Sequence, residues 1–483
     1  MPVKLHAGLK IGEFTLVELL HEGGMSRLWG VSHAQIDVPL LMKLPRIDYG
    51  EAVSQVVSFE VERMLMPVIG GVHVPRFFGS GEFEDQPWLV MQQLEGDTLE
   101  ALLKLVPLAP ARVAQLGALA AQALDDLHRQ HVIHLDVKPG NLLLHVDPTN
   151  RQERIVLLDF GLSHHVDLPD LLAEQFDVPM GTSAYIAPEQ VLGVRNDPRS
   201  DLFALGVTLY QLATGNLPFG TPTSNHGMKR RLYQEPIAPR SLNPAVPRWL
   251  QEIILRCLEV DANLRYPTAA QLAFDLLHPE QVALTGRADR RQQGGRLAGW
   301  RRWFVSLGSR VERSEGKSVD ASRAPLILVA IDLKQSNPAL DEALREMTRR
   351  VMQTATDARL ACVTVMRVAR IGVEPNLDAE GRSRHVKRLI ALRHWARSLN
   401  LAEQRITFHV LEGAEAADAL IDYARSNAID HLVMGARGVT GMRRLLGSVS
   451  SRVVAEANCT VTVVRARADT PRDPDADGPT PGA

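Results

Sequence analysis

The segment HLDVKPGN at residues 134–141 contains side chains suited to phosphoryl transfer, a reaction that needs positioned phosphates, metal ions and an oriented nucleophile. Asp136 can orient a hydroxyl nucleophile and accept its proton, and Lys138 can neutralise charge on the transferred phosphate. Asn141 can hold a metal ion. Asp159, in the segment LLDFGLS that follows, can hold a metal between the β- and γ-phosphates. Together these residues predict a phosphotransferase centre that uses a metal ion.

Neither motif alone identifies such a centre, because a bare Asp-Phe-Gly usually forms an ordinary turn. The order of the motifs is more informative. Asp-x-Lys-Pro-x-Asn is followed by Asp-Phe-Gly and then by Ala-Pro-Glu at residues 187–189. An ordered set of this kind rarely arises by chance, so it favours a catalytic assembly over unrelated turns.

The hydrophobic pattern predicts the elements that must position these motifs. GEFTLVELL, VPLLMKL and PWLVMQQL are short apolar runs typical of strands, and all three precede residue 95. ARVAQLGALAAQALDDLHRQ has its apolar residues at helical spacing. The sequence therefore predicts a strand-rich first part and a helical part after it, with the motifs close to their junction.

Residues 1–280 resemble a protein kinase of the bacterial serine/threonine type, in the form without arginine in the catalytic loop. The resemblance implies an α+β bilobal fold, ATP and Mg²⁺ as cofactors, and a Ser or Thr of a protein as acceptor. The positions that match the family pattern are Gly23 and Gly24 in the glycine-rich loop over ATP, Lys43 for the α- and β-phosphates, Glu62 as the partner of that lysine with Glu60 as the fallback, Met91 beside the adenine, Asp201 and Gly206 beneath the catalytic loop, and Arg265 as the partner of Glu189.

Two departures from the family pattern bear on activity. His21 and Ser26 stand where glycines let the backbone approach the phosphates, which could weaken nucleotide binding. Leu135 stands where the family commonly has an arginine that pairs with a phosphorylated residue of the activation loop and so orders that loop. Without the arginine, a phosphate on this loop loses its usual partner.

The activation loop has no residue that could be phosphorylated. From His164 to Gly181 it contains no Ser, Thr or Tyr, so the arginine and the phosphorylation site are missing together. Leu135 thus indicates that regulation by activation-loop phosphorylation is absent, more than that the enzyme is inactive. The alternative is a catalytically silent pseudokinase that acts as a nucleotide-sensing scaffold, but Lys43, Asp136 and Asp159 are all present.

Composition limits the other classes of function. The 483 residues carry a formal net charge of −2 and 45% hydrophobic residues, which favours two or three folded domains and gives no case for nucleic-acid binding. Three distant cysteines suggest neither a disulfide framework nor a zinc site, and no segment has the length of a membrane span. We expect a soluble cytoplasmic protein with a basic linker at 281–323 and a disordered Pro/Asp-rich tail at 467–483.

Residues 324–466 show a second pattern, in which short apolar runs alternate with helices. This order predicts an α/β domain with an open parallel sheet. The glycine-rich segment MGARGVTGMRRLLGSVS follows a buried strand and opens into a helix, so its backbone N–H groups could present a phosphate cradle. The cradle residues would be Gly435, Gly438, Gly447 and Ser448, with Asp332 at the end of the first strand. Plain strand-to-helix turns remain an alternative explanation for these glycines.

Residues 324–466 also resemble the universal stress protein family. Asp332 matches the family's aspartate, but the interval between Gly438 and Gly447 is one residue shorter than in the nucleotide-binding members. The resemblance therefore implies the fold more firmly than ATP binding. It also implies stress-related regulation and a possible homodimer through the last strand, CTVTVV.

Overall fold

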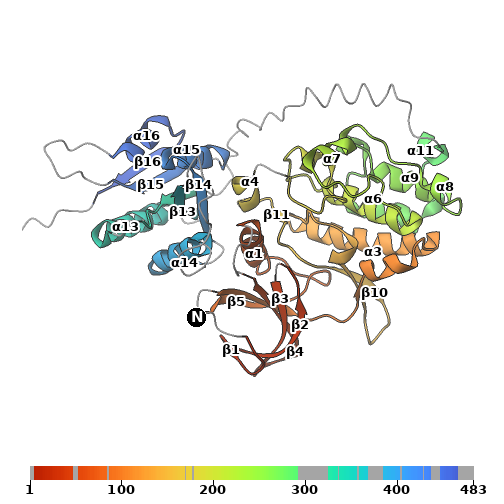
Figure 1. Ribbon diagram of the computed structural model, residues 1–483, viewed down its shortest axis with the longest axis horizontal. Coiled ribbons are helices and arrows are strands. Elements are labelled where there is room, and N and C mark those ends of the chain that lie inside the picture. Colours follow the sequence, from red (N-terminus) through yellow and green to blue (C-terminus); the bar gives the residue numbers. More distant parts are fainter. Residues whose placement is uncertain are drawn as a thin grey trace, which may run out of the picture. The chain divides into compact units, whose positions relative to one another are not determined.

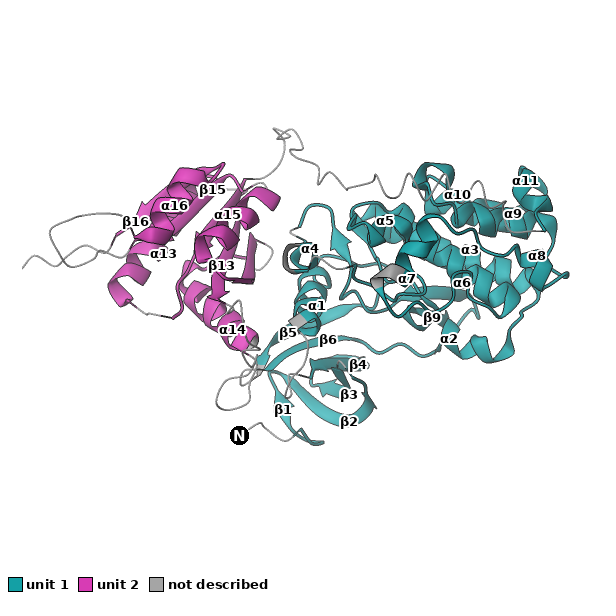
Figure 2. Cartoon of the chain, turned by 45° about the horizontal axis from the view of Figure 1, so that its top comes forward, with its two compact units in different colours: residues 1–315 teal, residues 316–483 magenta. Residues whose placement is uncertain are grey.

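The computed structural model divides the chain into two compact units, residues 1–315 and 316–483 (Figure 2). The structure describes residues 5–24, 26–46, 53–83, 86–168, 170–176, 179–291, 325–334, 337–355, 358–367, 384–402, 405–427, 429–436 and 447–465. Gly438 of the predicted cradle, the predicted tail at 467–483 and most of the predicted linker lie outside these ranges.

The first six strands of unit 1 form one antiparallel sheet in the order β1-β2-β3-β4-β6-β5 (Figure 1). They are β1 (Lys10–Ile11), β2 (Phe14–Glu22), β3 (Ser26–His33), β4 (Ile36–Pro45), β5 (Phe77–Phe83) and β6 (Gln86–Gln92). On β4, Leu40, Met42 and Leu44 are buried in one apolar cluster. Because side chains alternate along a strand, Lys43 lies on the other face, where it meets helix α1 (Val53–Leu65).

The rest of unit 1 is mainly helical and carries only short strands. Its helices are α2 (Leu99–Leu102), α3 (Pro110–Arg129), α4 (Leu171–Gln175), α5 (Pro188–Val191), α6 (Arg199–Thr214), α7 (Asn225–Lys229), α8 (Pro239–Leu242), α9 (Arg248–Cys257), α10 (Ala269–Leu277) and α11 (Gly286–Asp289). Its strands are β7 (Asp97–Thr98), β8 (Val132–Ile133), β9 (Leu142–Val146), β10 (Glu153–Leu157) and β11 (His164–His165). Helix α6 is buried along most of its length and packs against α3 and α9, so it is the central helix of this part.

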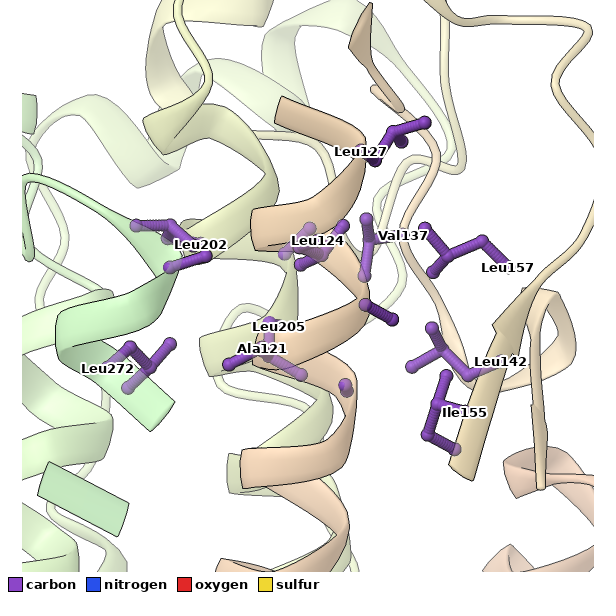
Figure 3. Close-up of a cluster of buried hydrophobic side chains, with 14 of the residues drawn as sticks. Ala121, Leu124, Leu127, Val137, Leu142, Ile155, Leu157, Leu202, Leu205 and Leu272 are labelled. Atoms are coloured by element: carbon purple, nitrogen blue, oxygen red, sulfur yellow. The ribbon is translucent and has the colours of Figure 1, made fainter. Parts of the chain in front are cut away.

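One apolar core holds both sequence motifs in place (Figure 3). The members drawn there come from α3, α6, α10, strand β10 and the residues around the catalytic loop. They include Ala121, Leu124, Leu127, Val137, Leu142, Ile155, Leu157, Leu202, Leu205 and Leu272, each at most 1% exposed. Val137 lies between Asp136 and Lys138, Leu142 follows Asn141, and Leu157 lies two residues before Asp159 of the Asp-Phe-Gly motif. The polar groups therefore project from a backbone that is anchored on both sides by close packing.

Residues 281–291, the first part of the predicted linker, pack against α9 in the structure. Thr285 donates hydrogen bonds to the Glu252 carboxylate through its N–H at 3.0 Å and its hydroxyl at 2.9 Å. Arg287 Nε donates to the same carboxylate at 2.9 Å, and Arg287 Nη1 donates to Glu259 at 3.1 Å. The packed structure of unit 1 thus continues beyond residue 280, where the domain boundary was predicted.

Unit 2 has the predicted parallel sheet, with five strands in the order β14-β13-β12-β15-β16. The strands are β12 (Leu326–Ala330), β13 (Arg359–Arg367), β14 (Ile406–Gly413), β15 (His431–Gly435) and β16 (Thr460–Val464). The helices are α13 (Pro338–Thr354), α14 (Arg384–Ala396), α15 (Ala416–Ser426) and α16 (Ser448–Glu456). The central strands β12, β13 and β15 are almost continuously buried, as expected for a parallel sheet covered by helices.

Two further findings concern the class of protein. Across the described ranges, no helix combines the length and the apolar character that crossing a membrane requires. Cys257, Cys362 and Cys459 are free thiols, and the first two are buried. The three cysteines therefore form no disulfide with one another.

Candidate active site

Lys43 on β4 lies between two carboxylates. Its Nζ donates hydrogen bonds to Glu62 Oε2 at 2.6 Å and to Asp159 Oδ1 at 3.1 Å. Burial opposes the charge on Lys43, but Asp159 and Glu62 outweigh it and raise the pKa of the ammonium. In turn, the Lys43 charge lowers the pKa of Asp159 to about 2. At neutral pH the site therefore contains a fixed cation, suited to phosphate oxygens, beside a fixed anion, suited to a metal ion.

The structure brings Glu62 of α1 to the lysine, whereas Glu60 pairs with Arg63 at 3.5 Å. Glu62 is 2% exposed, and burial raises the pKa of its carboxyl. A buried carboxylate is costly unless it is paired, so the contact with Lys43 also fixes the position of α1 against the sheet.

Asp136 is the centre of a hydrogen-bond network in the catalytic loop. Its Oδ1 accepts bonds from the Thr182 hydroxyl at 2.7 Å and the Thr182 N–H at 3.0 Å. Its Oδ2 accepts from Lys138 Nζ at 2.7 Å and from Asn141 Nδ2 at 3.1 Å. Lys138 also donates to the Thr182 hydroxyl at 2.9 Å. The orientation of the carboxylate is thus set by four donors, and one of them is the aliphatic hydroxyl of a threonine.

Asp201, at the start of α6, holds the backbone of the catalytic loop from below. Its carboxylate accepts the N–H groups of His134 and Leu135, both at 2.8 Å, and contacts His128 Nε2 at 2.8 Å. Gly206, five residues further along α6, lies where a Cβ would come within 2.5 Å of the Cys257 side chain. Only glycine therefore allows α6 and α9 to pack this closely beneath the loop.

Leu135 has a structural place in the loop, although it lacks the family's guanidinium. It is 3% exposed, and its φ of 61° lies in the left-handed region, which is unusual for a leucine. Its N–H bonds to Asp201, and its carbonyl accepts from Gln190 Nε2 at 3.0 Å. These two bonds hold the strained conformation, and the apolar side chain fills a buried position.

The activation segment is held by contacts that involve no phosphate. Asp170 caps α4 by accepting the Ala173 N–H at 3.1 Å, and it accepts a second bond from Arg195 Nε at 2.7 Å. Arg195 Nη2 also donates to the Leu162 carbonyl at 2.9 Å. In addition, Leu171 and Leu172 are buried in the core of unit 1. Neither Asp170 nor Arg195 belongs to a recognisable motif, so the sequence analysis did not find this pair.

The segment from Thr182 to Glu189 follows the activation segment and is anchored at its far end. Glu189 Oε1 and Oε2 accept from Arg265 Nη1 and Nη2 at 2.7 and 2.8 Å. This bidentate pairing fixes the carboxylate and the guanidinium relative to each other. The Ser200 hydroxyl donates to Glu189 Oε1 at 2.7 Å. The structure thus brings together the Glu189–Arg265 pair that the family resemblance implied.

The remaining predicted nucleotide contacts lie on the sheet. Gly23 directly follows β2, and its N–H donates to the Ser26 carbonyl at 3.0 Å. A Cβ on Gly23 would come within 3.1 Å of the His21 ring, whereas a Cβ on Gly24 would meet nothing within 4 Å. The backbone at Gly24 is therefore open even with His21 and Ser26 in place of glycines. Met91 on β6 is buried at 7% exposure, at the end of the strand that pairs with β4.

The residues predicted to hold a metal are chemically suited to Mg²⁺. Asn141 Nδ2 donates to the Asp136 carbonyl at 2.9 Å, so the amide group is oriented with its oxygen left over as a possible ligand. Asp159 supplies a carboxylate that stays ionised. Mg²⁺ prefers such hard oxygen ligands and usually takes its others from water and substrate phosphates. Within the described ranges no group of three His, Cys, Asp or Glu side chains could hold a metal ion by itself.

A second candidate site lies at one edge of the sheet in unit 2. Because β12 and β15 are parallel neighbours, Asp332 after β12 and Gly435 at the end of β15 share this edge. Asp332 Oδ1 accepts the Lys334 N–H at 2.9 Å, and Gly447 is the N-cap of α16, which begins at Ser448. Gly435 has a packing role as well, because a Cβ there would lie within 3.0 Å of the Leu340 side chain on α13.

Comparison with known proteins agrees with this geometry. Residues 16–276 match the model of the protein kinase domain, and residues 326–465 match that of the universal stress protein family. The chain is 31% identical to the serine/threonine-protein kinase pkn2 of Myxococcus xanthus over 278 residues, 57% of this chain and 33% of the relative. It is 28% identical to the serine/threonine-protein kinase PknB of Mycolicibacterium smegmatis over 269 residues, 55% of this chain and 42% of the relative.

Both relatives are longer proteins, of which the chain covers less than half. Among solved structures, the PknI kinase domain of Mycobacterium tuberculosis is matched with a TM-score of 0.44 and 22% identity, over 57% of this chain and 99% of that domain. The family model of the protein kinase domain covers more than half of the chain, including every residue of the active-site network described above. The chain belongs to the protein kinase family, and its kinase domain is followed by a domain of the universal stress protein family.

Proposed function

We propose that the chain is a serine/threonine protein kinase that transfers the γ-phosphate of ATP to the hydroxyl of a Ser or Thr in a protein substrate. The observation that carries the proposal is the joint geometry of two groups. One group is Lys43 with Glu62 and Asp159, and the other is Asp136 with Lys138. The relatives of the chain are named as serine/threonine protein kinases, which supports the same activity.

In the proposed reaction, Asp136 orients the acceptor hydroxyl and takes its proton as the oxygen attacks the γ-phosphorus. The bond from the γ-phosphorus to the bridging oxygen breaks, and ADP leaves. Lys43 holds phosphate oxygens of ATP, and Lys138 offsets charge on the group in transfer. Mg²⁺ held by Asn141 and Asp159 would neutralise charge on the β- and γ-phosphates. The bond from the Thr182 hydroxyl to Asp136 shows that this carboxylate can accept from an aliphatic alcohol.

The test is a time course with labelled ATP and a generic protein acceptor, using the full chain beside its Asp136→Asn variant. Loss of the base should slow transfer by about a hundredfold or more. Equal labelling by both proteins would reject the assignment of Asp136. No labelling by either would favour the alternative of a silent nucleotide-sensing scaffold, which no present observation favours.

We also propose that unit 2 regulates the kinase in response to stress-related signals, and that it binds ATP at Asp332, Gly435, Gly438, Gly447 and Ser448. Asp332 and the N-terminus of α16 support the nucleotide site by their chemistry. A homodimer through β16 is supported by the position of this strand at the edge of the sheet. The cytoplasmic location and the domain limits 1–280, 281–323, 324–466 and 467–483 stay predictions.

A further inference from the structure

Arg231 is a buried arginine outside every predicted motif. It lies in the single-turn 3₁₀ helix Arg230–Leu232 after α7 and is 1% exposed. Its Nη1 donates to the Ile186 carbonyl, its Nη2 donates to the Ser183 carbonyl at 2.6 Å, and its Nε donates to the Met228 carbonyl at 3.0 Å. Two of these three acceptors belong to the segment from Thr182 to Glu189, whose first residue holds the catalytic Asp136.

The charge of Arg231 makes this arrangement unusual. Among the described residues, no carboxylate lies within ion-pair distance of its guanidinium, and burial lowers the pKa of Arg231 to about 10. The side chain is still a cation at neutral pH, and a buried cation without a carboxylate is costly. Its partners are the carbonyl dipoles and the ring of Phe219, 5.6 Å from the guanidinium carbon. A residue kept for stability alone would be better replaced by an apolar side chain.

Aromatic side chains connect Arg231 to the other anchor of the segment. Phe219 stacks on Phe203 with ring centroids 5.8 Å apart. The guanidinium of Arg265 lies 5.0 Å from the centre of the Phe203 ring, and the same guanidinium binds Glu189. Two buried arginines, with two stacked rings between them, therefore hold the two ends of one short segment.

We propose that Arg231 is a positioning residue for phosphoryl transfer to protein substrates. By fixing the carbonyls of Ser183 and Ile186, it sets the backbone on which the Thr182 hydroxyl meets Asp136. The inference rests on the proposed kinase function, because the segment matters only if a protein acceptor binds against it. Arg231 acts through this segment, and its hydrogen bonds go to the carbonyls of Met228, Ile186 and Ser183, not to Lys43 or to the predicted metal ligands.

The experiment uses the full chain with Arg231→Met, Arg231→Gln and Arg231→Lys. Arg231→Met removes all three donors, Arg231→Gln keeps amide donors without the charge, and Arg231→Lys keeps the charge without the planar fork. Arg230→Met is the matched control, because Arg230 is the exposed neighbour and makes no side-chain bond in the described structure. Three kinds of measurement are made: the affinity for ATP, the steady-state kinetics (kcat and KM) with a protein acceptor, and deuterium exchange at the amides of residues 182–187.

We expect Arg231→Met to lower kcat/KM for the protein acceptor by about tenfold to a hundredfold, since misplacing a reacting group by an ångström has effects of this size. ATP affinity should stay within about twofold, exchange at 182–187 should rise, and Arg231→Gln should fall between Arg231→Met and wild type. If Arg231→Met does not fold, Arg231→Gln and Arg231→Lys carry the test. Exchange and kcat/KM equal to those of Arg230→Met would overturn the proposal. A fall in melting temperature alone would overturn it too.

The exchange measurement needs no activity, so it separates the two proposals. If wild type transfers no phosphate while Arg231→Met loosens residues 182–187, the kinase function is rejected and the anchoring contact stands. If wild type transfers phosphate, and substitution of Arg231 changes neither the deuterium exchange at residues 182–187 nor kcat/KM, the kinase function stands and the inference is rejected.

Discussion

Arg195 Nε donates a hydrogen bond to Asp170 Oδ2 at 2.7 Å, and the same arginine holds the Leu162 carbonyl at 2.9 Å. This places a guanidinium across the activation segment, joining the residue that caps α4 to the residue that follows Asp-Phe-Gly. The Arg195 side chain is 9% exposed, so water weakens the pair little. The carboxylate of Asp170 therefore supplies a negative charge within the activation segment without any phosphorylation.

The first prediction is that this kinase needs no phosphorylation of its activation loop. Enzyme stripped with phosphatase, and then freed of it, should phosphorylate an added acceptor without a lag. The reason is that no Ser, Thr or Tyr occurs from His164 to Gly181, while Leu171 and Leu172 already order the segment by burial. A lag that prior autophosphorylation removes, with the phosphate mapped to Thr182 or Ser183, would contradict this.

The second prediction concerns the pair itself. Asp170→Asn and Arg195→Met should each lower the rate of transfer by about tenfold. The double variant should lose little more, because each single change already breaks the Asp170–Arg195 ion pair. The control is Arg248→Met, which removes an exposed ion pair with Asp289 in the same unit. Additive losses in the double variant, or an equal loss in the control, would show that the pair does not order the segment.

How far the sequence predicted this site depends on where the partners lie. Asp136, Lys138 and Asn141 fall within one loop, so their types and spacing indicated their chemistry directly. Asp170 and Arg195 come from separate segments, and an isolated Asp or Arg has no signature. The contacts of Arg231 could not be predicted from the sequence for another reason. Its partners are backbone carbonyls, which every residue has. Both missed contacts serve to hold the segments around the site.

The fold was predicted in part. The periodic patterns gave β2, β4 and β6 of the first sheet, helix α3 and the parallel sheet of unit 2, whereas β1, β3 and β5 of the first sheet were not predicted. The packing of residues 281–291 against α9 was not foreseen, because nothing in this basic, glycine-containing segment indicates that Glu252 accepts hydrogen bonds from Thr285. Gly435 illustrates a different limit, since a glycine that admits Leu340 and a glycine that admits a phosphate look alike in sequence.

The third prediction tests the charges at the catalytic centre. Lys43→Met and Asp159→Ala should each lower transfer by at least about a hundredfold, because each removes a charge that stabilises the transferring phosphate. Lys104→Met provides the comparison, since Lys104 is an exposed lysine in the single-turn 3₁₀ helix Leu103–Leu105, which follows α2. Unchanged rates for both variants, on an added acceptor and on the enzyme itself, would remove Lys43 and Asp159 from the mechanism.

The fourth prediction is a pH effect on stability. Lys43 holds the pKa of Asp159 at about 2, below the ordinary 3.8. A lowered pKa means that the folded state favours the ionised carboxylate. Its contribution to stability is therefore complete above pH 3.8 and is lost as the pH falls toward about 2. In Lys43→Met this contribution should shrink, so the melting temperature of unit 1 should fall less steeply with acid than in wild type. Parallel curves for the two proteins would contradict the coupling.

The last prediction returns to Leu135. Restoring the family's arginine with Leu135→Arg should bring no gain in rate, because no phosphate is available for the new guanidinium. Leu135 is 3% exposed and its backbone has a φ of 61°, so the substitution would also place an unpaired charge in a buried, strained position. We expect a lower melting temperature than wild type and a transfer rate no higher. Leu135→Met keeps an apolar side chain of similar volume and should retain the activity, which separates loss of packing from introduction of charge. A Leu135→Arg enzyme that is faster than wild type, and whose gain disappears on phosphatase treatment, would show that this chain still carries a phosphate switch.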